Sequence, residues 1–300
     1  MLSNFRKTFV LVAVVASLST GCKYSKEYQQ LTEASSKYTT AVDGLLIKAG
    51  ELQVESTSEN ILSDDRLLNQ TVPNYREKSN EDKEMLQVIN DIRSHNRLLQ
   101  KYFSKLNELA QSKAPEDTQK EIDGIATNLQ TISSSLKNSS FFPKPGILQG
   151  IGNLAIHSKI NGALRKELEK RDRVILQELT IQQELLKNLS GFMKNKVEMK
   201  RLAQEQRFVI RPLIDTEPVE NEESWIEKRN EIFAIDTRVE EIENASVALG
   251  EFKTVFEDSV EGKITGVRLK NALKDIDSFL ALLENKQQTN QEDNQQNATN

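Results

Sequence analysis

The chain has 300 residues with 12 Gly and 6 Pro, well below the average usage of about 7% and 5%, so the residues typical of tight turns are scarce. This composition excludes collagen-like and low-complexity proteins and disfavours sheets built from many short strands. A net charge of −5 gives no reason to expect nucleic acid as a partner, and one Cys with two His provides neither an internal disulfide nor a well-supplied metal site.

Residues 1–21 have the layout of a secretory signal peptide. Arg6 and Lys7 precede an uncharged, mostly apolar run at 9–18, and small residues follow this run. The run is about half as long as the roughly 20 residues that a membrane-spanning helix needs. The sequence Leu-Ser-Thr-Gly-Cys that ends at Cys22 resembles the lipobox of bacterial lipoproteins, although the commonest form has Leu rather than Ser three places before the Cys.

The resemblance implies a lipid anchor at Cys22, because in that family the thiol receives a diacylglyceryl group and the signal peptide is cut off before the Cys. The cut would remove two cations and no carboxylate, so the net charge would change from −5 to −7. Lys23 stands where Asp typically retains lipoproteins in the inner membrane. The resemblance therefore implies the periplasmic face of the outer membrane, or the outer face of the membrane in a single-membrane cell. An ordinary signal peptide, cut near Ala16 or Gly21 with Cys22 left as a free thiol, is the alternative.

Apolar residues after the anchor recur three and four residues apart, which is the spacing of a helix that faces a partner helix. Six such stripes follow one another along the chain, at 24–52, 85–110, 122–136, 154–210, 232–256 and 269–283. They share no repeat of fixed length, which argues against a solenoid. The sequence therefore predicts an all-α fold over residues 22–284: an elongated antiparallel helical bundle, coiled-coil-like, of about six helices.

Polar residues and prolines predict where these helices begin. Residues 64–78 are interpreted as a linker before a helix whose N-cap is Ser79. Ser224 with Glu227 is typical of a capping box ahead of the fifth helix. The segment 285–300, in which ten residues are Asn or Gln, is predicted to be a disordered tail because it cannot bury enough apolar surface.

No motif for catalysis or cofactor binding emerges. His95 and His157 lie on separate stretches without a carboxylate cluster, so each is expected to be solvated or locally hydrogen-bonded. The glycines at 146–152 follow no strand and precede no Gly-Lys-Ser/Thr, which argues against a phosphate loop. No Ser stands in a Gly-x-Ser-x-Gly elbow with a His placed to activate it. We therefore expect a non-catalytic protein with no cofactor and no metal.

The connection at 141–156 places large apolar side chains among turn-forming residues, including Phe141, Phe142, Ile147, Leu148 and Ile151. One interpretation is a hydrophobic cap that folds back over the end of the bundle. The other is an exposed tip that contacts a partner protein or inserts into a lipid interface. The second arrangement loosely resembles helical pore-forming toxins, in which an apolar hairpin lies between long helices.

The sequence thus favours a lipid-anchored cell-envelope protein with a structural or protein-interaction role. Its expected partners are the membrane, through lipidated Cys22, and an unidentified envelope protein. The alternative function is that of a membrane-active helical protein that uses the apolar segment 141–156.

Overall fold

The computed structural model describes residues 3–64, 70–111, 115–157, 160–215, 217–233 and 238–263, together with positions 267, 271 and 274. In the first helix, side chains are described from Tyr28 onward. The predicted sixth helix, apart from isolated positions, and the predicted tail at 285–300 lie outside the described residues.

The described residues form helices and no strand. The helices are α1 (Ser3–Asp64), α2 (Val72–Gln111), α3 (Pro115–Leu136), α4 (Pro145–Gln149), α5 (Gly162–Glu205), a π-helical turn η2 (Gln206–Ile210), α6 (Arg211–Ile214), α7 (Glu222–Phe233) and α8 (Arg238–Val260). The prediction of an all-α bundle is confirmed.

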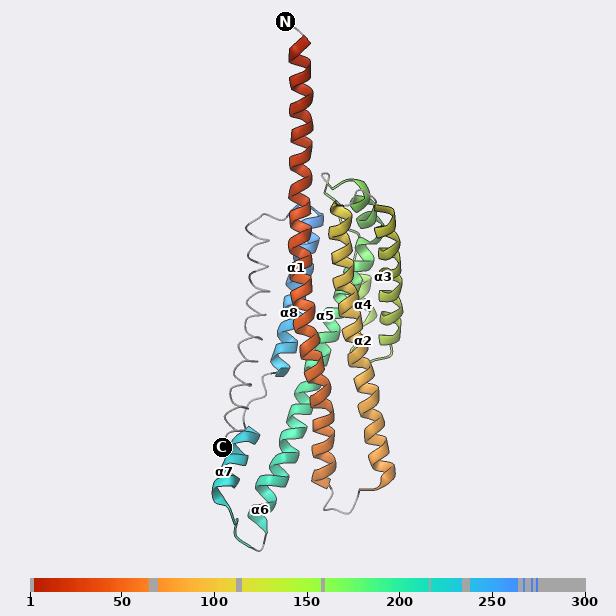
Figure 1. Ribbon diagram of the computed structural model, residues 1–300. Coiled ribbons are helices and arrows are strands. Elements are labelled where there is room, and N and C mark those ends of the chain that lie inside the picture. Colours follow the sequence, from red (N-terminus) through yellow and green to blue (C-terminus); the bar gives the residue numbers. More distant parts are fainter. Residues whose placement is uncertain are drawn as a thin grey trace.

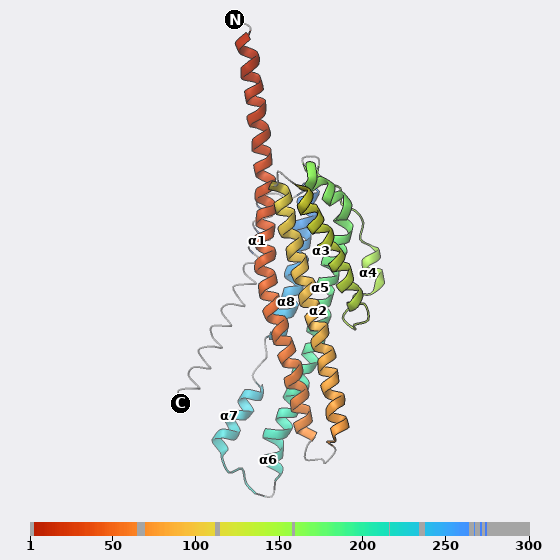
Figure 2. The same ribbon diagram turned by 45° about the vertical axis from the view of Figure 1, so that its right-hand side comes forward.

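The long helices lie side by side in an elongated bundle (Figure 1). Helices α1 and α5 run in one direction, whereas α2 and α8 run in the other. The N-terminal part of α1 projects beyond the other helices at one end, which we call the anchoring end. Helices α6 and α7 lie at the opposite end, which we call the far end, where α1 ends and α2 begins (Figure 2). In the described residues, no helix is long and apolar enough to cross a membrane.

The core is built from the predicted stripes. On α1, the stripe members with described side chains are all buried, and even its polar member Ser35 is only 6% exposed. Phe103 of α2 meets Phe252 and Phe256 of α8 edge to face, with ring centroids 4.8 and 5.2 Å apart. The hydroxyl of Tyr38 donates to the carbonyl of Ala245 over 2.9 Å, so this buried polar group of the core is satisfied.

Helix α2 begins earlier than predicted, at Val72. The backbone N–H of Asn74 donates to the hydroxyl of Thr71 over 3.3 Å, so Thr71 caps the helix and the prediction of Ser79 as N-cap is wrong. Pro73 is tolerated because the first helical turn needs no N–H at that position. The connection between α1 and α2 is therefore only about half as long as the predicted linker.

The predicted long helix also has different limits. Helix α5 begins at Gly162 rather than near residue 154, and the helical path then continues through η2 and α6, past Pro212, to Ile214. Proline lacks an N–H and its ring clashes with the carbonyl four residues earlier. The π-helical turn just before Pro212, in which the N–H of Arg211 donates to the carbonyl of Gln206, provides the wider turn that accommodates it.

The predicted fifth helix is two helices, α7 and α8, with residues 234–237 between them outside the described residues. The capping residue of α7 is Asn221, because its side-chain oxygen accepts the backbone N–H of Ser224 over 2.9 Å. The prediction of Ser224 as the cap is therefore wrong by three residues, although the start of a helix in this region is confirmed.

Candidate interaction surfaces

The predicted lipid anchor lies close to the folded body in the sequence. Cys22 belongs to the projecting part of α1, and Tyr28 further along the same helix is almost completely buried. One turn later, the hydroxyl of Thr32 donates to the carbonyl of Phe103 in α2 over 3.0 Å. The interval between Cys22 and the first described core residue is thus less than two helical turns.

The apolar segment 141–156 is largely packed against the bundle. Phe141 is 3% exposed, and its ring meets that of Phe192 in α5 edge to face at a centroid distance of 5.4 Å. Phe142, Leu148 and Ile151 are half-buried against the core. Ile147 is the exception, with 42% of its surface exposed.

This segment runs along the side of α5 and does not cap the end of the bundle. Asn188 donates to the carbonyl of Phe141 over 2.9 Å, and Gln177, three turns earlier on α5, donates to the carbonyl of Leu148 over 3.4 Å. The backbone N–H of Leu154 then donates to the carboxylate of Asp172. The packing therefore supports the structural interpretation of the segment, with its position corrected from the bundle end to the flank of α5.

A polar cluster lies in the middle of the bundle. His95 is fully buried, and its Nδ1 and Nε2 atoms lie 2.8 Å from Gln182 Oε1 and 2.8 Å from Glu178 Oε2. The hydroxyl of Ser133 also donates to the carboxylate of Glu178. The expectation that His95 is solvated or only locally bonded is therefore wrong, because its partners lie on α5, more than 80 positions away in the sequence.

The cluster has the residue types of a hydrolytic triad but a different arrangement. Ser133 bonds to the carboxylate rather than to the imidazole, so the order of contacts differs from a Ser-His-Asp triad, in which the imidazole activates the hydroxyl. All four side chains are buried. The cluster is best read as a set of hydrogen bonds that joins α2, α3 and α5. The signal for it was present in the sequence, since Gln182 is a polar member of an otherwise apolar stripe.

A second buried cluster lies nearer the anchoring end. The guanidinium of Arg171 pairs with the carboxylates of Glu167 and Asp123, and the hydroxyl of Tyr102 lies 3.4 Å from Glu167 Oε1. Burial raises the pKa of Glu167 to about 7, and burial likewise raises the pKa of Tyr102. Each charged group has a partner within the molecule, so this cluster ties α2 and α3 to α5.

No metal centre is found in the part of the chain that the structure describes, since no three His, Cys, Asp or Glu side chains there are placed to hold an ion. His157 lies away from the polar cluster around His95. Its backbone N–H donates to the carbonyl of Val260 over 2.7 Å, at the end of α8.

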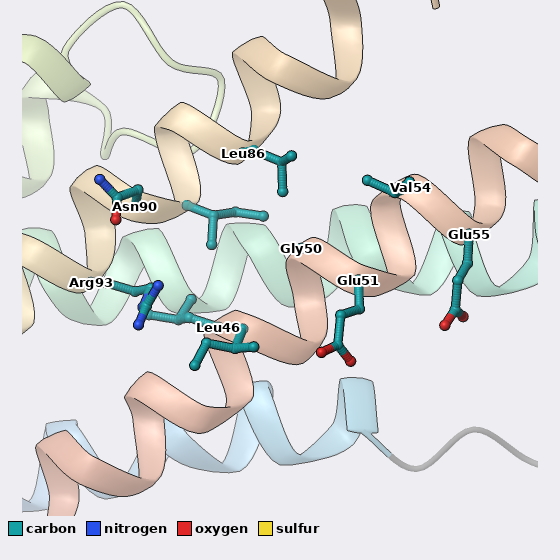
Figure 3. Close-up of a pocket in the computed structure, with 10 residues that line it drawn as sticks. Leu46, Gly50, Glu51, Val54, Glu55, Leu86, Asn90 and Arg93 are labelled. Atoms are coloured by element: carbon teal, nitrogen blue, oxygen red, sulfur yellow. The ribbon is translucent and has the colours of Figure 1, made fainter. Parts of the chain in front are cut away.

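A shallow groove of about 530 Å³ lies between α1 and α2 (Figure 3). Gly50 of α1 faces α2, and a Cβ atom there would come within 2.9 Å of Leu86 Cδ2. Ile47, Val54 and Leu86 line the groove, are partly exposed and lie outside the predicted stripes, which is why sequence reasoning missed it.

The charged groups at the rim of this groove are already engaged. The guanidinium of Arg93 forms two hydrogen bonds with the carboxylate of Asp43, at 2.8 and 2.9 Å. Glu55 pairs with Lys200 of α5 over 2.7 Å. The groove therefore offers a small apolar surface, with Asn90 as its uncharged polar lining residue.

Exposed apolar side chains are most numerous at the far end. They come from α1 and α2, from the continuous path α5–η2–α6, and from α7: Leu62, Val72, Tyr75, Met199, Leu202, Ile210, Leu213, Ile214, Ile226 and Phe233. The sequence predicted no interaction surface here. The sequence does not show which apolar residues are exposed, because apolar residues at helical spacing are equally typical of a core.

No protein-family model matches the chain, and comparisons with curated proteins and with solved structures give no match.

Proposed function

We propose that this protein is a lipid-anchored, non-catalytic component of the bacterial cell envelope whose helical body presents a protein-interaction surface away from the membrane. The observation that carries the proposal is the arrangement of the two ends. The predicted acylation site, Cys22, is at the anchoring end, whereas the exposed apolar side chains gather at the far end.

The body is long enough to act as a spacer. Residues 28–64 of α1 form one continuous helix, which at 1.5 Å per residue spans about 55 Å. The interval of fewer than two helical turns between Cys22 and Tyr28 leaves little slack between the acyl chains and the body. Lys23 favours the periplasmic face of the outer membrane in a cell with two membranes, and the outer face of the membrane in a cell with one.

The membrane-active function is less well supported. It requires Phe141, Phe142, Leu148 and Ile151 to reach a lipid interface, whereas these side chains pack against α5 and the core. Membrane attachment through acyl chains needs no such segment, because each buried CH₂ contributes about 0.8 kcal/mol and two or more chains give a stable anchor.

The proposal is tested by replacing the acylation site. Expression of the full chain with Cys22→Ala in a bacterial host fed a fatty-acid analogue should give an uncleaved, unlabelled protein. The wild type and a control variant, Ser25→Ala, should be labelled and cleaved. Equal labelling of Cys22→Ala and the wild type would show that the anchor is elsewhere and would remove the basis of the proposal.

A further inference from the structure

An apolar stripe of the far end faces solvent. Met199, Leu202, Ile210 and Leu213 follow one another at multiples of three and four residues along α5, η2 and α6, and all four are exposed. Ile214 at the end of this path is 73% exposed. Such spacing normally marks the buried face of a helix, so this stripe is a helix face that no other described part of the chain covers.

Helix α7 packs beside this stripe and adds a further exposed apolar side chain to the far end. The indole N–H of Trp225 donates to the carbonyl of Val209 over 3.2 Å, which holds the start of α7 against η2. Ile226, the next residue on α7, is 54% exposed. We call residues 210–227 the acidic tip.

The acidic tip carries an unbalanced charge. Residues 212–227 contain six carboxylates and neither Lys nor Arg. Glu222 and Glu223 stabilise the positive end of the α7 dipole. Glu217, Glu220 and Glu227 have no such role: all three are exposed, and none pairs with a cation within the described part of the chain.

Three basic residues near the tip do not offset this charge because they are held by other groups, and a fourth, Arg229, has its guanidinium 5.2 Å from the centroid of the Phe233 ring. Arg207 pairs with Glu59 of α1 over 3.2 Å, and Arg211 donates to the carbonyl of Ser63. Lys228 pairs with Glu231 over 2.5 Å, one turn further along α7.

The charge discriminates between the possible occupants of this surface. Two copies of the chain meeting tip to tip would bring like charges together, and an anionic membrane would repel the carboxylates. A partner segment with Lys or Arg beside an apolar face satisfies both features of the tip, because its cations meet the glutamates while its apolar side chains cover Ile214 and Ile226.

We infer that the acidic tip docks a basic amphipathic helix of a partner protein. This inference rests on the proposed interaction role of the protein and identifies the surface and the chemistry of the partner. The exposed path from Met199 to Leu213 extends over four turns, which matches the length of a short amphipathic helix lying along it.

The test measures binding of a synthetic amphipathic peptide of about five helical turns, made of Leu and Lys, to the full lipidated protein in nanodiscs of zwitterionic lipid. The matching Leu–Glu peptide and empty nanodiscs are the controls for the probe. Glu217→Lys with Glu220→Lys removes the charge, and Ile214→Ser with Ile226→Ser removes the apolar contact. Glu116→Lys with Glu251→Lys makes the same charge change at exposed positions outside the tip.

We expect both tip variants to raise the dissociation constant of the Leu–Lys peptide at least about tenfold, and the control variant to leave it within about twofold. Equal binding by wild type and both tip variants, or equal binding of the Leu–Glu peptide, would overturn the inference. Two further results would overturn the inference. If the wild type sediments as a dimer and the Ile214→Ser/Ile226→Ser variant does not, the occupant is a second copy of the chain. If the wild type binds anionic vesicles and that variant does not, the occupant is a membrane. Fatty-acid labelling of Cys22 is scored separately, so failure at the tip is distinguishable from failure of the anchor.

Discussion

Single residues decide how the ends of the helices are closed, and Gly262 is the clearest case. It follows α8 with a positive φ of 69°, its N–H donates to the carbonyl of Ser259, and the N–H of Lys263 donates to that of Asp258. These two bonds form a Schellman motif, which satisfies the last carbonyls of the helix. A Cβ atom on Gly262 would also overlap the imidazole ring of His157.

We expect Gly262→Ala to lower the free energy of unfolding by at least about 2 kcal/mol, because the left-handed conformation penalises a side chain and the imidazole must move. Gly124→Ala in α3 is the matched control. A Cβ there meets nothing within 4 Å, so the change should raise stability by up to about 1 kcal/mol through helix propensity. Urea denaturation of the mature chain measures whether each variant is less or more stable than the wild type. An unchanged free energy of unfolding for Gly262→Ala would contradict the role assigned to this turn.

At the scale of elements, the segment 141–156 shows how a connection becomes part of the core. It packs along a flank of α5, with Phe141 against Phe192 and Leu148 beside Gln177. The pattern of apolar residues indicated that the segment is buried or binds something. To decide between burial and binding, one must know where α5 lies relative to the segment. That position is set by contacts between residues far apart in the sequence.

We expect Phe141→Ala to lower the free energy of unfolding by about 3–5 kcal/mol, since it deletes a buried aromatic side chain from a packed site. Ile147→Ala, on the exposed side of the same segment, should change it by less than about 1 kcal/mol. Thermal and urea denaturation measure the difference. Unchanged stability of Phe141→Ala, together with loss of vesicle binding by the non-lipidated protein, would instead favour the membrane-active function.

For the whole molecule, the proposed anchor and the length of the bundle together predict how far the tip stands from the membrane. With Cys22 acylated, a cysteine introduced at position 116 or 217 is the single free thiol for a fluorescent label. Glu116 is near the anchoring end of the bundle and Glu217 is at the far end. The net charge of −7 after signal-peptide removal disfavours a body that lies flat on an anionic surface.

We expect the label at position 217 to be about 50 Å farther from a lipid-bound acceptor dye than the label at position 116, as measured by resonance energy transfer in vesicles. Similar transfer from both positions would mean that the bundle lies along the membrane. In that case the acidic tip would not be presented at a distance from it.

The sequence by itself determined the fold class and most of the core of this protein. Local spacing is enough for that, because apolar residues three and four apart are on one face of a helix whatever the helix packs against, and Tyr38, Leu99 and Leu186 are buried as their stripes predict. The start of α7 was predicted to within a few residues, because the signal there is local. At α2 and α5 the prediction differed by more, since polar and glycine residues are compatible with several starting points.

Only the tertiary structure decided which stripes are covered and which polar residues meet. Ile175 and Leu202 both fit a helical spacing on the same path, yet Ile175 is buried in the half of the bundle where α3 and α8 pack around α5, and Leu202 faces solvent near the far end. His95 finds its partners on α5 for the same reason. Burial and long-range hydrogen bonds depend on which helices are neighbours, and neighbours are chosen by the packing of the whole chain rather than by any local pattern.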